Sequence, residues 1–232
     1  MIAAATTALL PRPSAPAANA RGDAPQVDVR ELLKVPAFRI VIALAALIYG
    51  SHALYDAFAV IRWDDAGLDA SVISMLWAEA VAAEVVVFFL VGPWLISRIG
   101  VRGAAALAAV AGIVRWSAIG FTESVLVLSL LQPLHGLTFA LLHLACMRVL
   151  GTVIPAALAA TSQALYAFGA SFVTAVLMLC AGPLYADYGG AAFLSMAALC
   201  AMAVPLAWYG LTETALKAEP RDVREFSVAP GA

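Results

Sequence analysis

Four side chains with polar or aromatic chemistry recur along one face of an otherwise apolar stretch, residues 131–148. At about 100° of rotation per residue they fall within one narrow sector of an α-helix, and they are Gln132, His135, Phe139 and His143. An imidazole can donate or accept a hydrogen bond and can carry a proton. Because a lipid-like helix turns its polar stripe toward protein or a water-filled cavity, we expect this stripe to face neighbouring helices.

Further ionisable and polar side chains lie inside other apolar segments. A charge near the centre of a bilayer costs about 2.5–3.5 kcal/mol on insertion scales, so each one needs a partner or a function. His52 and Asp56 are four residues apart and therefore share a helix face. The full set on the other segments is His52, Tyr55, Asp56, Glu79, Glu84, Arg115 and Gln163.

The predicted depths of these groups indicate which of them can meet. With a rise of about 1.5 Å per residue, Glu79 and Arg115 lie about 11–12 Å below one membrane surface, and Glu84 about 18 Å. Gln132 and His135 fall at about 11 and 15 Å. Two interpretations follow. Arg115 forms an ion pair with Glu79 or Glu84 that only ties helices together, or these groups bind substrate and protons. His135 either binds substrate or protons, or forms a hydrogen bond that only joins two helices.

Metal and cofactor chemistry is not indicated. The three histidines lie on two helices, without the cysteine or carboxylate cluster that a metal site uses. The three cysteines lie inside apolar runs, where they are expected to be small buried hydrophobes and not disulfide partners. They are Cys146, Cys180 and Cys200.

Composition places the chain in a membrane. Of its 232 residues 64% are hydrophobic and 12% charged, and its mean hydropathy is +0.95. Soluble domains are about 45–50% apolar and about 25% charged. The charges sit in short loops and tails instead of a basic patch, so a nucleic-acid partner is not expected.

Six apolar segments define the expected all-α fold of a polytopic membrane protein. Each is long enough for a bilayer core of about 30 Å, and they cover residues 36–63, 71–97, 103–121, 125–150, 156–184 and 191–211. The turns between them are marked by charges, Gly and Pro. The bundle covers residues 36–212. It is preceded by a cytoplasmic segment rich in Ala and Pro, residues 1–35, and followed by a cytoplasmic tail, residues 213–232.

Basic residues give the bundle an orientation. With the N-terminus inside, eleven Lys and Arg side chains fall on the inner side and only Arg62 on the outer side. The positive-inside rule therefore predicts that the N- and C-termini are both cytoplasmic.

The pattern of motifs resembles the C-terminal half of a major facilitator superfamily (MFS) transporter, in the phenylpropionic acid permease and nucleoside–proton symporter-like branch. The resemblance covers residues 36–211. It rests on these motifs in order: Ser51-His52-Ala53 with Tyr55, Trp77 through Glu84, Arg115-Trp116, Leu134-His135-Gly136 with Phe139 and His143, Gln163-Ala164-Leu165-Tyr166, and Gly182-Pro183-Leu184-Tyr185.

This resemblance implies proton-coupled uptake of a small organic solute across the inner membrane of a bacterium. Glu84 would gain and lose the proton. Arg115 would set the pKa of Glu84 or meet an anionic substrate. His135 and Gln132 would hydrogen-bond the solute. The remaining candidates for the solute and proton pathway are His52, Tyr55, Glu79 and Gln163.

Two departures from the family pattern are visible. Residues 93–102 resemble the cytoplasmic gating loop, with Arg98, Gly100 and Arg102 in place, but Ser97 stands where an Asp is usual. Such transporters also have twelve helices in two halves that hold the solute between them. The first half is absent here, so the expected partner is an N-terminal six-helix half, and we expect the chain to derive from a longer or truncated gene.

Two rival functions differ in class. One is a non-transporting remnant or structural subunit that only packs in the membrane. The other is an integral membrane enzyme, which would need a nucleophile–base pair or a metal near one interface. The sequence offers no such constellation, so an enzyme is not expected.

Overall fold

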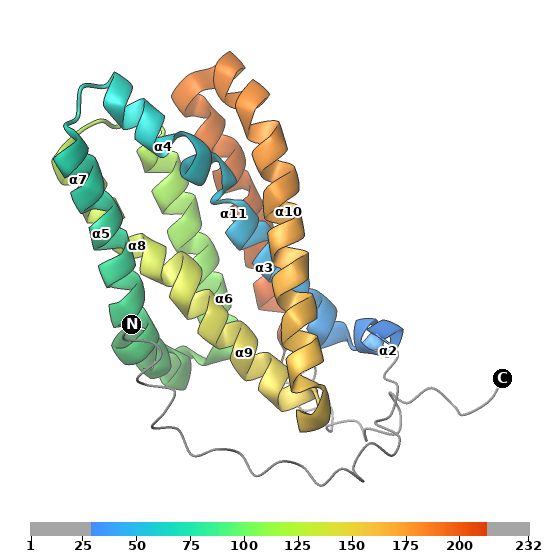
Figure 1. Ribbon diagram of the computed structural model, residues 1–232. Coiled ribbons are helices and arrows are strands. Elements are labelled where there is room, and N and C mark those ends of the chain that lie inside the picture. Colours follow the sequence, from blue (N-terminus) through green and yellow to red (C-terminus); the bar gives the residue numbers. More distant parts are fainter. Residues whose placement is uncertain (1–28, 213–232) are drawn as a thin grey trace, which may run out of the picture.

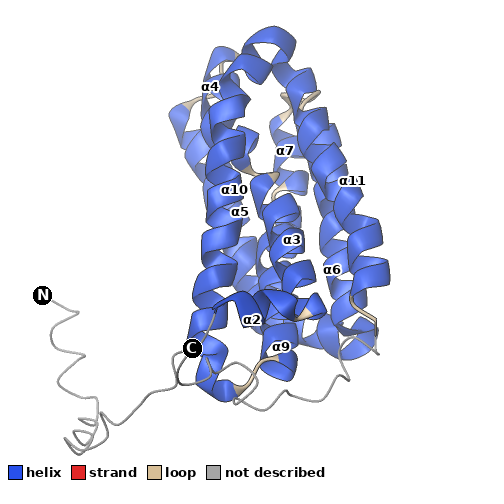
Figure 2. Cartoon of the chain, turned by 90° about the vertical axis from the view of Figure 1, so that its right-hand side faces the viewer, coloured by secondary structure: helices blue, strands red, loops and turns tan. Residues whose placement is uncertain are grey.

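The computed structural model describes residues 29–212. Within that range every regular element is helical, and the helices form one elongated bundle (Figures 1 and 2). The all-α class is thus confirmed for the described residues. Most of the predicted 1–35 segment and the whole predicted 213–232 tail lie outside the described residues.

The helices follow one another through short turns. In chain order they are α2 (Val29–Lys34), α3 (Pro36–Gly50), α4 (Ala53–Asp65), α5 (Ala70–Val86), η2 (Val87–Val91), α6 (Gly92–Ile119), α7 (Val125–Leu131), α8 (Pro133–Gly136), η3 (Leu137–Leu141), α9 (Leu142–Val153), η4 (Ala156–Leu158), α10 (Ala159–Tyr188), η5 (Gly189–Ala192) and α11 (Phe193–Gly210).

Four helical stretches among the described residues are long and apolar enough to cross a membrane: Pro36–Asp65, Ala70–Ile119, Val125–Val153 and Ala156–Gly210. The second and fourth, of 50 and 55 residues, each contain a glycine with positive φ. Gly100 has a φ of 70° and Gly189 a φ of 54°, a conformation that only glycine adopts without strain. Both lie at turns that the sequence predicts.

The first predicted segment is not the continuous helix that the apolar run over residues 36–63 suggests. Ser51 and His52 interrupt it between α3 and α4, and the second part continues to Asp65. Ser51 Oγ and His52 Nδ1 both donate to the carbonyl oxygen of Ile48, at 2.6 and 2.9 Å. The His52 backbone N–H bonds to Tyr49, three residues back, at 2.9 Å. These local bonds compete with the α-helical pattern and tighten the turn.

A buried hydroxyl fixes this helix break to the rest of the bundle. Ser51 is fully buried. Its Oγ accepts a hydrogen bond from Trp116 Nε1 at 2.8 Å and one from Cys200 Sγ at 3.3 Å. The break in the α3–α4 stretch is therefore tied to α6 and α11, which pack closely against each other.

A close helix crossing sets the geometry on the other side of the bundle. α5 packs on α8, and a Cβ on Gly136 would lie 2.6 Å from the Ala83 carbonyl oxygen. Only a glycine allows the two backbones to approach this far. The π-helical segments η2 and η3 begin just after this crossing and pack against each other. The crossing brings His135 on α8 next to Glu84 on α5.

Candidate functional site

A cavity of about 670 Å³ opens in the side of the bundle. Its wall combines aromatic rings, imidazoles and carboxylates with small side chains of α10. The lining residues are Tyr49, His52, Asp56, Trp77, Glu84, His135, Phe139, His143, Tyr166, Ala167, Ala170, Ser171, Thr174, Ala175 and Met178. Ligand cavities of soluble and membrane proteins have about 300–1,000 Å³, so this one is large enough for a small organic solute.

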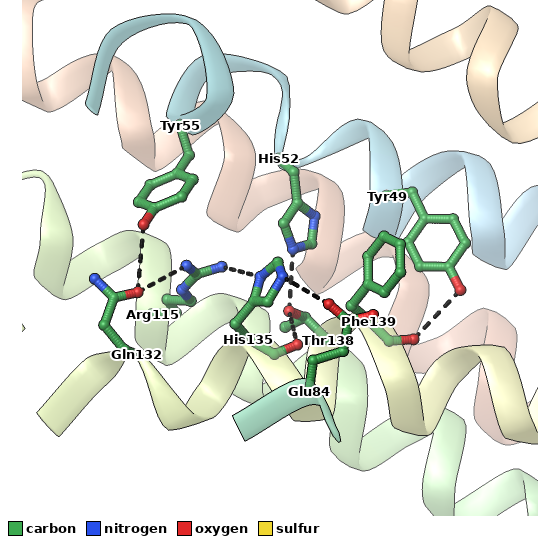
Figure 3. Close-up of polar contacts among 9 residues, drawn as sticks. All are labelled: Tyr49, His52, Tyr55, Glu84, Arg115, Gln132, His135, Thr138 and Phe139. Atoms are coloured by element: carbon green, nitrogen blue, oxygen red, sulfur yellow. Dashed lines mark hydrogen bonds and ion pairs between the residues drawn. The ribbon is translucent and has the colours of Figure 1, made fainter. Parts of the chain in front are cut away.

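At the cavity wall, one imidazole links a guanidinium to a carboxylate (Figure 3). Arg115 Nη1 donates to His135 Nδ1 at 3.1 Å. Because a guanidinium can only donate, Nδ1 must be the acceptor, which places the ring proton on Nε2. His135 Nε2 lies 3.6 Å from Glu84 Oε2. The carboxylate thus faces the N–H of a ring whose other nitrogen is held by Arg115.

Arg115 itself is fully buried behind this wall. Its guanidinium carbon lies 4.5 Å from the ring centres of both Tyr55 and Trp116. Gln132 Oε1 accepts a hydrogen bond from Arg115 Nη2 at 3.2 Å and one from the Tyr55 hydroxyl at 3.3 Å. Two aromatic faces and one amide oxygen therefore stabilise the positive charge.

Of the two alternatives for Arg115, the ion pair with Glu79 or Glu84 is not formed in the described residues. Within the described residues Arg115 contacts no carboxylate. The His135 ring occupies the space between Arg115 and Glu84. Glu79 is turned away, because five residues of α-helix rotate it by about 140° from Glu84. Its carboxylate accepts a hydrogen bond from Ser129 on α7 at 3.3 Å.

Other predicted site residues also lie apart from the cavity. Gln163 is exposed on α10 and is not part of the lining. Of the predicted gating-loop residues, Gly100 lines a second pocket of about 620 Å³. The Arg102 guanidinium lies 3.9 Å from the centre of the Trp208 ring, and that of Arg98 lies 6.0 Å from the centre of the Trp94 ring.

His52 joins the cavity wall from the helix break. Because its Nδ1 donates to a carbonyl, its Nε2 is free to accept, and it lies 3.1 Å from Thr138 Oγ1. The Thr138 hydroxyl also lies 3.1 Å from the His135 carbonyl oxygen. The His52 and His135 rings are 5.4 Å apart. The break in the α3–α4 stretch thus places a second imidazole beside the first.

The sequence analysis misses Tyr49 and Thr138, and it names Tyr166 only as part of a motif. Tyr166 donates to the Tyr49 hydroxyl at 3.1 Å, and Tyr49 donates to the Phe139 carbonyl oxygen at 3.3 Å. Tyr49 precedes His52 by three residues and Thr138 follows His135 by three. Helical spacing could therefore have placed both near the polar faces, but neither differs from an ordinary buried side chain by type alone.

The chemistry of the site is that of a binding cavity that can hold a proton. Glu84 is a weak acid, His135 Nε2 is a donor, and the surrounding rings offer apolar faces. Within residues 29–212 no group of three or more His, Cys, Asp or Glu side chains is arranged to bind a metal ion.

Comparison with known proteins identifies the family. The model of the MFS_1 like family matches residues 5–197. The chain belongs to the MFS_1 like family. It is also 36% identical, over 159 residues, to a protein of Escherichia coli (strain K12) named "Probable 3-phenylpropionic acid transporter". That alignment covers 67% of this chain and 41% of the relative, so the chain spans less than half of the relative's length.

This MFS family is a family of transporters. Together with the four apolar helical stretches, membership in it makes the chain a multi-pass membrane protein. The resemblance to the phenylpropionic acid permease branch that the motifs predict is confirmed.

Proposed function

We propose that this chain forms the solute- and proton-binding half of a proton-coupled MFS transporter in the inner membrane of a bacterium. The observation that carries the proposal is the contact of Glu84 with His135, whose ring is held by Arg115, at the wall of an aromatic cavity. The proposed solute is a small aromatic carboxylic acid, because the relative is named for one and the cavity combines rings with hydrogen-bond donors.

The geometry suggests how a proton would be coupled to the solute. Ionised Glu84 attracts the Nε2–H of His135 and repels an anionic solute, strongly so in a medium of low dielectric constant. Protonation of Glu84 removes the repulsion of the anionic solute and weakens the attraction between Glu84 and the Nε2–H of His135. The solute carboxylate can then accept from His135, while Arg115 keeps the ring oriented. Solute and proton would therefore bind together, which is the requirement for symport.

We further propose that the four apolar stretches amount to six membrane crossings. Gly100 and Gly189 divide the two long stretches into parts of about 20–30 residues, each of which spans a bilayer core of about 30 Å. An even number of crossings agrees with the positive-inside assignment of both termini to the cytoplasm. Residues 1–35 and 213–232 would then flank a membrane bundle of residues 36–212.

This orientation can be tested by thiol labelling. In a variant without its native cysteines, a cysteine at Asp65 should react with an impermeant maleimide in intact cells. A cysteine at Ile99, which is also exposed, should react only after the inner membrane is opened. Reaction of the Ile99 cysteine from outside would reverse the proposed orientation.

A second six-helix unit is the proposed partner. Alternating access in MFS transporters requires two bundles that rock about a central site. The chain aligns with only 41% of its relative, and all cavity residues named above come from one bundle. An N-terminal half would supply the second wall of the pathway.

Uptake measurements test the function. We expect proteoliposomes that contain this chain together with an N-terminal half to accumulate 3-phenylpropionic acid saturably when a proton gradient is imposed. Proteoliposomes with the chain alone should show only background uptake, because an open half-site cannot alternate. Nucleosides and sugars serve as comparison solutes. Gradient-driven uptake by the chain alone would refute the need for a partner. Failure of every solute with both halves present would favour a non-transporting subunit.

A further inference from the structure

The cavity wall is chemically uneven. Its two carboxylates belong to α4 and α5, and Trp77 also belongs to α5. The rings of Tyr49, Phe139 and Tyr166 gather beyond His135. The Tyr49 ring lies 4.9 Å from that of Phe139 and 6.4 Å from that of Tyr166. In Figure 3, Tyr49 and Phe139 lie on one side of His135, and Arg115 lies on the other. One end of the cavity is therefore an aromatic chamber, made of Tyr49, Phe139, His143 and Tyr166.

The two tyrosine hydroxyls in this aromatic chamber are already engaged. Tyr166 donates to Tyr49, and Tyr49 donates to the Phe139 backbone carbonyl. These bonds fix the rings and leave their faces, not their polar tips, to meet a ligand. The chamber thus suits an apolar ring better than a charged group. The polar part of the same ligand would lie toward His135 and Glu84.

Between Tyr166 and Met178, which also line the cavity, α10 contributes only small side chains over two turns. They are Ala167, Ala170, Ser171, Thr174 and Ala175. The bulky residues of this part of α10 point elsewhere: Phe168 and Phe172 are 67% and 58% exposed and do not line the cavity. The space beside the aromatic chamber therefore exists because α10 carries no large side chain on this face between Tyr166 and Met178.

We infer that the small-residue face of α10 sets the size of the ring that the transporter accepts. The ring of the solute packs against the small side chains of α10 beside the aromatic chamber, and its carboxylate points to His135 and Glu84. This assignment rests on the proposed function and adds to it the residues that determine ring size. Ala167 follows Tyr166 at the aromatic end of the cavity. A larger side chain at this position should most directly reduce the space for the ring of the solute.

A matched pair of substitutions isolates this effect. Ala167 and Ala164 are both exposed on α10, but only Ala167 lines the cavity. Binding of 3-phenylpropionic acid and of the larger 3-(2-naphthyl)propionic acid is measured by calorimetry on the chain in lipid nanodiscs. Ala167→Leu should lower the affinity for the naphthyl acid about tenfold or more relative to the phenyl acid, because one methylene of misfit costs about that much. Ala164→Leu should leave both affinities unchanged.

The possible results separate the two proposals. If Ala167→Leu changes neither affinity, or lowers both equally, the role of α10 is refuted while aromatic-acid binding stands. If the unmodified chain binds neither acid, both the α10 assignment and the proposed solute class fail. Thermal unfolding verifies that each variant is folded, and Ser171→Leu replaces Ala167→Leu if that variant is not. Ser171 is exposed on the same cavity face, so the same loss of affinity for the naphthyl acid is expected.

Discussion

Replacing Glu84 by glutamine should abolish proton-driven accumulation of the solute. Glutamine keeps the size of the side chain but cannot gain or lose a proton, so the cavity would no longer change its charge between the two states. The neutral amide also removes the repulsion of an anionic solute. We therefore expect gradient-driven uptake by the two-half transporter to fall to background, while exchange of labelled for unlabelled solute without a gradient persists.

The structure provides a control on the same helix. Glu79 bonds to Ser129 and does not line the cavity. Glu79→Gln keeps an oxygen that can accept from Ser129, so accumulation should be nearly normal. If Glu79→Gln abolishes accumulation and Glu84→Gln does not, the two acids have been assigned the wrong roles. Equal loss in both would show that a membrane-embedded carboxylate matters only for assembly.

Loss of the Gln132 side-chain amide should destabilise the fold more than most substitutions in this bundle. Gln132 is fully buried and accepts hydrogen bonds from the Arg115 guanidinium and the Tyr55 hydroxyl. Gln132→Leu preserves bulk but leaves a buried charge with one partner fewer, which costs about 1.5–3 kcal/mol. We expect a lower midpoint of thermal unfolding, measured on the purified chain in detergent.

A double substitution shows whether that cost depends on the guanidinium. In an Arg115→Met background the buried charge is gone, so Gln132→Leu should cost much less, with a coupling of about 0.5–3 kcal/mol between the two sites. Glu79 lies outside this contact network, so the effects of Glu79→Gln and Arg115→Met on the free energy of unfolding should be additive. Additive effects of Gln132→Leu and Arg115→Met would refute the bond between these residues as a source of stability.

Helical periodicity predicts the depth of Arg115 and Glu84 in the bundle but not whether the two side chains touch. Spacing along each segment placed an acid, a guanidinium and an imidazole at similar depth, and His135 does contact both of the others. The direct Arg115–Glu84 pair did not follow, because depth says nothing about which side chain stands between two others. That order depends on the α5–α8 approach at Gly136, where a Cβ would meet the Ala83 carbonyl oxygen at 2.6 Å.

By itself, the sequence determined the membrane class, the all-helical fold, the turns at Gly100 and Gly189, and the shared face of the histidine stripe. Each of these depends on local composition or on the fixed rotation of a helix. Tertiary structure alone decided how each helix is turned about its axis relative to its neighbours. It therefore excluded Glu79 and Gln163 from the cavity and brought Tyr49 into it, because the angle between packed helices is set by side-chain contacts from distant parts of the chain.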